Sequence, residues 1–267
     1  MMKKLVALVL ALSLCALTLA GCSGSGSNSL SDWEYIQDKG TLVIGITYFE
    51  PMNYFDGDGK LVGFETEFAE AVCAELGVEP VFQEIEWEQK ETELKSRNID
   101  CIWNGLTITD ERKENMAFST PYVNNYQAVV IRKADADKYT DLASLAGAKL
   151  CAENGSAGEE AIQGDENLSG AAYTAMDAQK SALLEVKAGA SDAAVIDVVY
   201  ANAVVKDDTD YSDLMIMDVE LAQELYGIGL RLEDTETLEK INAAIEKVKA
   251  DGTLDALAEK YGVNLCD

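Results

Sequence analysis

The feature that most constrains the fold is a regular alternation of short apolar strand patterns with amphipathic helix patterns along most of the chain. The first repeat shows the pattern clearly. The apolar run over residues 42–46 predicts a buried strand, and Phe64, Phe68 and Val72, spaced four residues apart, predict one face of a helix. Alternation of this kind is typical of α/β proteins with largely parallel sheets.

The alternation comes in two successive series, which predicts two lobes. In the first series we expect strands over residues 42–46, 81–85 and 99–103, helices over residues 63–76 and 88–97, a short helix after Thr109, and extended segments over residues 117–123 and 127–132. In the second we expect strands over residues 149–152, 173–176 and 192–196, helices after Gly155 and over residues 178–188 and 198–205, and C-terminal helices over residues 238–248 and 254–261. Open α/β sheets bind ligands at the carboxyl ends of their strands, so the predicted site is a cleft between the lobes.

The N-terminus has the pattern of an export signal. Two lysines precede an apolar run over residues 5–19, which is shorter than the roughly 20 residues that a membrane-spanning helix needs. The motif Leu-Ala-Gly-Cys that ends at Cys22 resembles the lipobox of bacterial lipoproteins. The resemblance implies a signal peptide over residues 1–21, a lipid on the Cys22 thiol and a flexible tether over residues 22–31. The alternative is a simple secretory signal with an incidental cysteine.

Composition excludes several classes of function. The chain has 48 acidic residues against 21 basic ones, a net charge of −27 and no histidine. So large a negative charge repels nucleic acid and bare anionic membranes, and neither is an expected partner. Without histidine there is no imidazole base and no His-ligated zinc site, which excludes Ser-His-Asp and Cys-His hydrolases. We expect neither a metal nor a cofactor.

The cysteines outside the signal and the lipobox form no C-x-x-C pair, so a metal or redox site is not expected among them. They are Cys73, Cys101, Cys151 and Cys266. The first three fall in apolar strand or helix patterns, which favours a role as small buried hydrophobic side chains. A disulfide formed after export is the open alternative.

Three segments carry candidate binding groups, and each has a plain structural alternative. Arg112 lies one turn into a helix capped by Thr109, where its planar guanidinium can bind a carboxylate, or else form a surface ion pair. Ser156 begins an S-x-x-E capping box whose free N–H groups suit an anion, or else mark an ordinary strand-to-helix turn. Asp197 ends an apolar strand, where it can hold an ammonium group or cap the next helix.

Taken together, the chain from residue 41 to residue 263 resembles the amino-acid substrate-binding proteins of ABC importers. These are the polar-amino-acid branch of solute-binding protein family 3, which has the type II periplasmic-binding-protein-like fold. The resemblance rests on stretches at residues 40–45, 59–64, 107–112, 117–122, 155–156 and 226–231. It implies two Rossmann-like lobes with a ligand cleft between them and a chain that crosses the hinge twice. The implied division is residues 32–124 and 224–267 for lobe 1 and residues 125–223 for lobe 2.

The resemblance also implies a set of ligand contacts. Arg112 is expected to clamp the α-carboxylate of an amino acid, and Asp197 to hold its α-ammonium group. The other contacts it implies are Thr107, Ser156 and Ala157 for the carboxylate, Gly105 for the ammonium group, and the rings of Phe49 and Trp87 against the ligand.

Selectivity for the ligand side chain is expected to depend on two departures from the family pattern. Thr47 falls where binders of basic amino acids carry an acid, which disfavours lysine or arginine. Asn104 falls where many relatives have serine, and is expected to contact a polar side chain. A neutral polar amino acid is therefore the expected ligand. Glu50 and Glu153 are further acids near the cleft whose roles the sequence leaves open.

The expected function is capture of an amino acid by hinge closure and its delivery to an ABC permease. The protein is expected to be monomeric, lipid-anchored on the extracytoplasmic face of the membrane, and not an enzyme. One alternative is an enzyme on the same fold, such as a cyclohexadienyl dehydratase that uses Glu50 or Glu153 as an acid. The other is a ligand-sensing module that contacts a receptor.

Overall fold

The computed structural model describes residues 30–266, and the residues from Asp32 onward form one compact unit. The predicted signal peptide, Cys22 and nearly all of the tether lie outside the described residues. Within residues 30–266, every helix is too short or too polar to span a bilayer.

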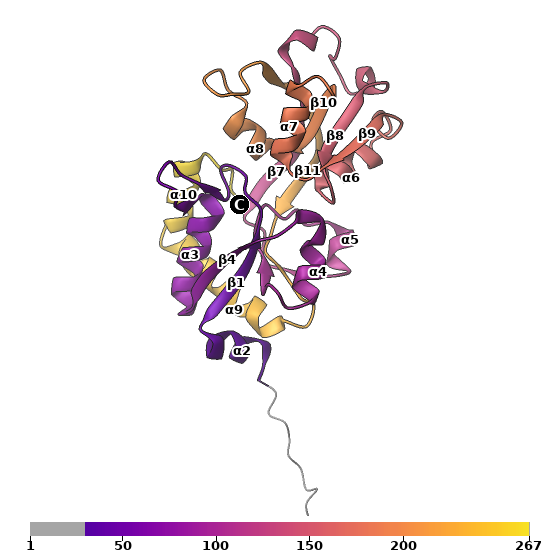
Figure 1. The fold of residues 1–267 in the computed structure, drawn as a ribbon. Coiled ribbons are helices and arrows are strands. Elements are labelled where there is room, and N and C mark those ends of the chain that lie inside the picture. The colour runs from indigo at the N-terminus through magenta and orange to yellow at the C-terminus, as the bar shows by residue number, and fades with distance from the viewer. Residues whose placement is uncertain (1–29, 267) are drawn as a thin grey trace, which may run out of the picture. The chain divides into compact units, whose positions relative to one another are not determined.

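The first lobe is built on a five-stranded sheet in the order β4-β1-β5-β12-β6 (Figure 1). Its strands are β1 (Thr41–Ile46), β4 (Glu79–Glu84), β5 (Cys101–Ile102), β6 (Ala117–Phe118) and β12 (Gly229–Leu230), with a small hairpin of β2 (Tyr54–Phe55) and β3 (Leu61–Val62) beside them. Its helices are α2 (Asp32–Lys39), α3 (Phe64–Leu76), α4 (Lys90–Lys95), α5 (Asp110–Lys113), α9 (Thr235–Ala250) and α10 (Thr253–Tyr261), and a 3₁₀ turn covers Trp87–Gln89.

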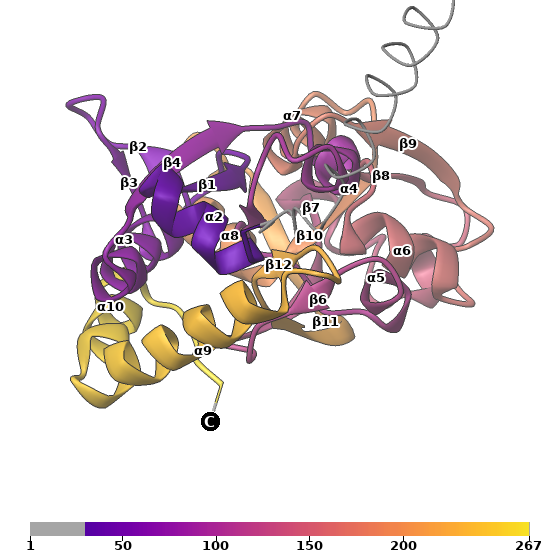
Figure 2. The same cartoon turned by 90° about the horizontal axis from the view of Figure 1, so that it is seen from below.

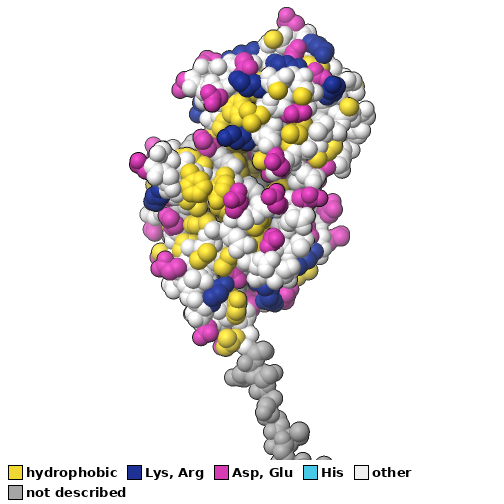
Figure 3. All heavy atoms as spheres, viewed as in Figure 1, with side chains coloured by type: hydrophobic (Ala, Val, Ile, Leu, Met, Phe, Trp, Pro, Cys, Tyr) yellow, Lys and Arg dark blue, Asp and Glu magenta, His cyan; other side chains and the backbone are white. Residues whose placement is uncertain are grey.

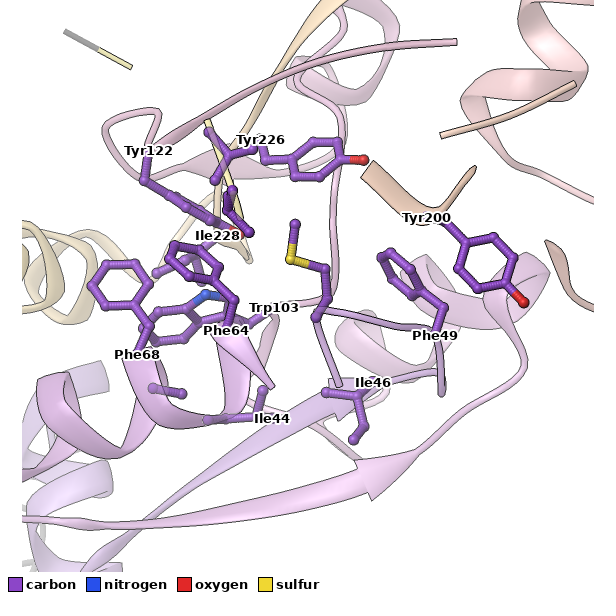
Figure 4. Packing of buried hydrophobic residues seen from close by; sticks show 14 of the residues in the cluster. Ile44, Ile46, Phe49, Phe64, Phe68, Trp103, Tyr122, Tyr200, Tyr226 and Ile228 are labelled. Carbon is purple, nitrogen blue, oxygen red and sulfur yellow. The ribbon is translucent and has the colours of Figure 1, made fainter. Parts of the chain in front are cut away.

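The core of this lobe follows from the apolar run that predicted β1. Alternate residues of the strand, including Ile44 and Ile46, are buried against the helix face that carries Phe64 and Phe68. Figure 4 shows these rings packed with Trp103 and other aromatic side chains, and Figure 2 shows α3, α9 and α10 lying together along one side of the lobe. Burial of this many large apolar side chains fixes the sheet against its helices.

The second lobe is built on a five-stranded sheet in the order β11-β7-β10-β8-β9. Its strands are β7 (Val123–Arg132), β8 (Lys149–Glu153), β9 (Ala172–Met176), β10 (Ala193–Asp197) and β11 (Leu214–Tyr226), and its helices are α6 (Ala157–Gly164), α7 (Gln179–Lys187) and α8 (Val198–Val204), with 3₁₀ turns over Lys133–Asp135 and Ala143–Leu145. Both faces of this sheet are covered. On β10, Ala194 and Ile196 belong to the same core as α7 and α8, whereas Ala193 and Val195 belong to the core around Ile162 of α6. Burial on both faces explains the unbroken apolar run of β10.

The two lobes are joined by the long antiparallel strands β7 and β11. Their pairing runs from Val123 opposite Tyr226 at one end to Arg132 opposite Leu214 at the other. Isolated bridges join Thr107 to Tyr226 and Val123 to Leu265, which attach this two-stranded connection to the first lobe. The predicted lobe boundaries, after residues 124 and 223, fall within these strands and remain a prediction.

The α/β fold is as predicted, but its sheets are less parallel than expected. Strand β1 is parallel to β4 and β5, and β8 is parallel to β9 and β10. The strands β6, β7, β11 and β12 pair antiparallel, because they belong to the segments where the chain passes between lobes and returns. Cys73, Cys101 and Cys151 are buried and form no disulfide, in agreement with their expected role as small hydrophobic side chains.

Candidate functional site

A small cavity lies between the lobes, with about 280 Å³ of space between its atoms. It is formed where β1 and β5 of the first lobe and β8 and β10 of the second lobe end, as expected for carboxyl ends of parallel strands. All nine residues expected to bind ligand line it: Phe49, Trp87, Asn104, Gly105, Thr107, Arg112, Ser156, Ala157 and Asp197. It is also lined by Thr47 and Glu153, which the sequence placed near the ligand without a direct contact, and by Gln179, which the sequence did not indicate.

Arg112 enters the cavity from the first turn of α5. The Thr109 hydroxyl caps this helix by accepting a hydrogen bond of 3.2 Å from the Arg112 backbone N–H. The guanidinium donates to the Thr107 carbonyl at 3.0 Å and pairs with Glu160 of the second lobe at 2.7 Å, and the residue is only 4% exposed. Of the two roles weighed from the sequence, the ion pair is present, and the binding of a ligand carboxylate by Arg112, which lines the cavity, remains a prediction.

Two cations of the first lobe converge on one carbonyl of the second. Lys90 Nζ donates to the Gly155 oxygen at 2.8 Å, and an Arg112 nitrogen donates to the same oxygen at 3.4 Å. Burial lowers the pKa of Lys90 to about 8. These contacts hold the start of α6 against the first lobe, so the described conformation is closed over the cavity.

The predicted capping box at the start of α6 is present, with one difference. The Ser156 hydroxyl accepts from the Glu159 N–H at 3.2 Å, as expected. The Glu159 carboxylate, however, accepts from the N–H of Gly155 at 2.7 Å rather than from that of Ser156. The cap therefore fixes the strand-to-helix turn that carries Ser156 and Ala157 into the cavity.

Asp197 lies at the N-cap position of α8, but its side chain makes no capping hydrogen bond. Its carboxylate instead accepts bonds of 2.7 Å from the amides of Asn125 and Gln127, and a third from Gln179. The residue is 8% exposed, and burial raises the pKa of the carboxyl. Of the two roles weighed from the sequence, the capping role is absent, and the carboxylate lines the cavity.

Gly105 is held in position by a buried acid that the sequence analysis missed. Its φ of +55° favours glycine, and a side-chain Cβ there would lie 2.8 Å from the Phe49 ring. Its N–H donates at 2.9 Å to each carboxyl oxygen of Glu65, which also accepts from the Tyr122 hydroxyl. Burial raises the pKa of Glu65 to about 7. The one signal in the sequence was an acid set between the apolar residues of α3.

Asn104 lines the cavity, but most of its hydrogen-bonding capacity is used within the first lobe. Its side-chain nitrogen donates to the Thr47 carbonyl at 2.8 Å and to the Asn53 side chain at 2.7 Å. Its oxygen accepts from the Thr47 hydroxyl at 2.7 Å. A ligand is left with one lone pair of that oxygen, which is less than a residue selecting a polar side chain would offer.

The two acids whose roles were open occupy different places. Glu153 lines the cavity, is 5% exposed, and receives no hydrogen bond on its carboxyl from any described residue. Burial, and after it the charge of Asp197, raises the pKa of Glu153 to about 8. Glu50 lies outside, in a pocket at the rim that also contains Tyr200. Figure 4 shows Phe49 directed toward Tyr200, and their rings meet edge to face at 6.0 Å, between cavity and rim.

The molecular surface agrees with a cleft at this place. Figure 3 shows hydrophobic side chains gathered on both sides of the line where the two lobes meet, among scattered acidic groups. The lining of the rim pocket includes the exposed rings of Tyr48 and Phe55.

Comparison with known proteins gives a consistent result. Residues 42–264 match the model of the bacterial extracellular solute-binding proteins, family 3. The chain is 31% identical to the L-cystine-binding protein TcyJ of Escherichia coli over 227 residues, which is 85% of this chain and 84% of that protein. It is 30% identical to the arginine-binding extracellular protein ArtP of Bacillus subtilis over 264 residues, 98% of each chain.

Solved structures are similar over nearly the same length. The crystal structure of Tv2483 bound to L-arginine superposes with a TM-score of 0.83 at 28% identity, covering 88% of this chain and 96% of that one. The ancestral amino acid-binding protein AncCDT-1, a precursor of cyclohexadienyl dehydratase, superposes with a TM-score of 0.79 at 30% identity, covering 86% and 99%. The family match covers most of the chain, and the fold and the cavity between its lobes agree with it. The chain belongs to family 3 of the bacterial extracellular solute-binding proteins, with the type II periplasmic-binding-protein fold.

Proposed function

We propose that this protein captures a neutral polar amino acid in the cavity between its lobes and delivers it to an ABC importer. The observation that carries the proposal is the placement of Arg112 and Asp197, a cation from one lobe and an anion from the other, around one small buried cavity. Buried charges are stable only when they are paired. A zwitterion would give Asp197 the cation that it lacks among the described residues, and would place a second carboxylate on Arg112, which already pairs with Glu160.

The remaining contacts complete the proposed site. The Thr107 hydroxyl and the N–H groups at Ser156 and Ala157 would assist Arg112, and the Gly105 carbonyl would assist Asp197. Phe49 and Trp87 would pack on the two sides of the ligand. All of these groups line the cavity, which supports the assignment.

The proposed side-chain class rests on Glu153 and Thr47. No acid stands at Thr47, and with a pKa near 8 most Glu153 carboxyls carry a proton at pH 7. A protonated carboxyl both donates and accepts, which suits an amide or hydroxyl of the ligand. The named relatives bind cystine and arginine, so the side chain is the part of the proposal that most needs a test.

Closure of the lobes would couple capture to transport. A ligand held by the first lobe gains Ser156, Ala157 and Asp197 only in the closed form, so its binding would favour that form. Capture from dilute medium requires a dissociation constant of about 1 μM, or roughly −8 kcal/mol. The closed form would dock as a monomer on the permease. The chain acts outside the cytoplasm, as its family does, and we propose that the Cys22 lipid holds it at the membrane.

A ligand screen tests this function. The mature chain, unfolded and refolded to remove bound ligand, is heated with each of the twenty amino acids and with cystine. At 100 times its dissociation constant a ligand adds about 2.7 kcal/mol, which should raise the Tm by roughly 5–10 °C. We expect the largest shift from a neutral polar amino acid. If no amino acid shifts the Tm, the proposed function is wrong.

A Glu153→Gln variant tests the side-chain class separately. Glutamine is neutral and has the same shape as the protonated acid, so a neutral polar ligand should keep its affinity within about threefold. A cationic ligand would need the ionised carboxylate, and its loss should weaken binding by 2–5 kcal/mol, or roughly 30- to 5,000-fold. Titration calorimetry of both proteins with glutamine and with arginine distinguishes a neutral from a cationic ligand side chain. Tight arginine binding that Glu153→Gln abolishes would leave the amino-acid site intact and overturn its neutral side-chain class.

The dehydratase alternative is favoured by one observation, the buried acid Glu153 in a fold shared with AncCDT-1. We expect no turnover of prephenate or arogenate by the purified chain, because each carries two carboxylates and Arg112 is the one cation among the described residues that line the cavity. Formation of phenylpyruvate or phenylalanine, abolished by Glu153→Gln, would establish the enzyme instead.

A further inference from the structure

Two buried carboxyl groups behind the ligand cavity share the same hydrogen-bond donors. Asn125 and Gln127 lie on β7, between Asp197 on β10 and Glu224 on β11. The Asn125 amide nitrogen donates to Asp197 Oδ1 at 2.7 Å and to Glu224 Oε2 at 3.0 Å. The Gln127 nitrogen donates to the same two oxygens at 2.7 and 3.1 Å. One oxygen of each carboxyl is thus held within reach of the same nitrogens.

No cation compensates for this pair of acids. Among residues 30–266, neither Asp197 nor Glu224 forms an ion pair with a lysine or arginine, and the amides that bridge them are neutral. The acids and hydroxyls facing them are Glu65 from α3, Glu153 from β8 and Tyr226 from β11. Lys113 of α5 lines the same outer pocket as Glu224 but pairs with Asp110, and Arg112 of α5 is bonded to the Thr107 carbonyl and to Glu160. Two adjacent buried carboxylates without a counter-ion do not both ionise readily.

The hydrogen bonds indicate which oxygen carries the proton. Both oxygens of Asp197 accept bonds, since Gln179 donates to Oδ2. On Glu224, all the bonds go to Oε2, including one of 3.0 Å from the Thr107 hydroxyl, and no described residue donates to Oε1. Burial, and after it the charge of Asp197, raises the pKa of Glu224 to about 7. Oε1 is therefore the position where a proton meets no competing donor.

Glu224 also has a route to water that bypasses the ligand cavity. Although only 9% exposed, it lines two further pockets, with about 1290 and 1150 Å³ of space that includes open solvent. Neither pocket is lined by Asp197. Asp197 thus faces the ligand cavity, whereas Glu224 faces the two outer pockets.

We propose that Asp197 and Glu224 share one proton, held on Oε1 of Glu224, and that an ammonium group captured at Asp197 drives this proton out to solvent. The O–H bond of the Glu224 carboxyl breaks, the proton passes to water or buffer, and Glu224 is left as a carboxylate. Glu224 is a positioning residue, since it acts on the ligand through Asp197 and the shared amides. The inference rests on the proposed function, because it requires an ammonium group at Asp197.

The sign of the pH dependence follows from linkage. A positive charge beside the pair lowers the pKa of Glu224, so the complex holds fewer protons than the free protein and affinity rises with pH. With a pKa near 7 in the free protein, about half a proton is released at pH 7, and affinity should rise about tenfold between pH 6 and pH 8. A Glu224→Gln variant has no proton to release, so its affinity should not change with pH over this range and should lie below the wild-type value even at pH 6.

Titration calorimetry in phosphate and in Tris buffer at pH 7 measures the proton count. The probes are L-glutamine, L-cystine and L-arginine, which share the α-ammonium group. For each probe that binds, we expect the wild type to release about half a proton more than Glu224→Gln. Asp218→Asn, which removes an exposed carboxyl from the same strand, should match the wild type. Equal proton counts in the wild type and Glu224→Gln would overturn the proposal.

An infrared measurement tests the resident proton without any ligand. At pH 6 the wild-type protein should show one more protonated carboxyl C=O band than Glu224→Gln, whereas Asp218→Asn should show no such loss. Absence of this difference would overturn the shared proton even if an amino acid binds. Its presence together with failure of every amino acid to bind would leave the proton pair standing and reject the proposed function.

Discussion

An Arg112→Ala variant is expected to lose amino-acid binding almost completely. Removing one partner of a buried charge pair costs about 3–5 kcal/mol, which corresponds to roughly 150- to 5,000-fold in affinity. The side chain is 4% exposed and lines the cavity opposite Asp197, so water cannot readily replace it. Titration calorimetry with the amino acid that gives the largest thermal shift measures the effect.

Three variants separate the carboxylate clamp from the other contacts of Arg112. Lys113→Ala removes the neighbouring cation, which is exposed and pairs with Asp110, and should leave affinity within twofold. Glu160→Gln breaks the half-exposed ion pair between the lobes and should weaken ligand binding by less than about 1 kcal/mol. Arg112→Lys keeps the positive charge but cannot bind a carboxylate through two parallel hydrogen bonds, so its affinity should lie between those of the wild type and Arg112→Ala. If the affinity of Arg112→Ala stays within fivefold of wild type, or if Glu160→Gln lowers affinity as much as Arg112→Ala does, Arg112 does not clamp the ligand carboxylate.

The second large effect is expected from Gly158→Ala, a substitution that would normally favour a helix. A Cβ at this position of α6 would lie 2.6 Å from the Val195 carbonyl oxygen of β10 and 3.0 Å from the Gln127 side chain. Since the Val195 oxygen is backbone, the helix itself has to move, at a cost of about 1–3 kcal/mol. The Tm should fall by roughly 3–10 °C. Ligand affinity should fall as well, because Ser156 and Ala157 begin this helix.

Gly164→Ala is the matched control for this substitution. It lies at the other end of α6, and a Cβ there meets no atom within 4 Å. Alanine is the better helix former by up to about 1 kcal/mol, so the Tm should stay constant or rise. Equal destabilisation by the two substitutions would show that the contact with Val195 is not what requires glycine.

The sequence predicts well those elements whose burial is one-sided or complete. The spacing of Phe64 and Phe68 predicted α3, and the apolar run before Asp197 predicted β10, because both patterns come directly from the face that meets the core. The long strand β11 was missed. Its pairing with β7 shifts register twice, and its residues pass from one lobe to the other, so no single apolar period describes it.

In the candidate site, too, some residues were predicted from the sequence and others were missed. Its nine expected residues lie at or soon after the ends of strands, in short motifs that can be read directly from the sequence, and the structure brings them to one cavity. Glu65, Gln127 and Glu224 were not foreseen, because their importance depends on which strand or helix lies beside them. A buried acid on α3 and a polar strand in the hinge acquire a role only through tertiary contacts.

The antiparallel pair β7 and β11 also determines how the protein transmits mechanical force. Asp32 and the segment that ends at Cys266 both belong to the part of the chain that packs with the first lobe, and the backbone enters and leaves the second lobe through these two strands. Tension between those positions is therefore carried by the first lobe and by the end of the β7–β11 pair where Val123 lies opposite Tyr226. The second lobe lies outside this load path, so under stretching it should remain folded after the first lobe has been pulled apart.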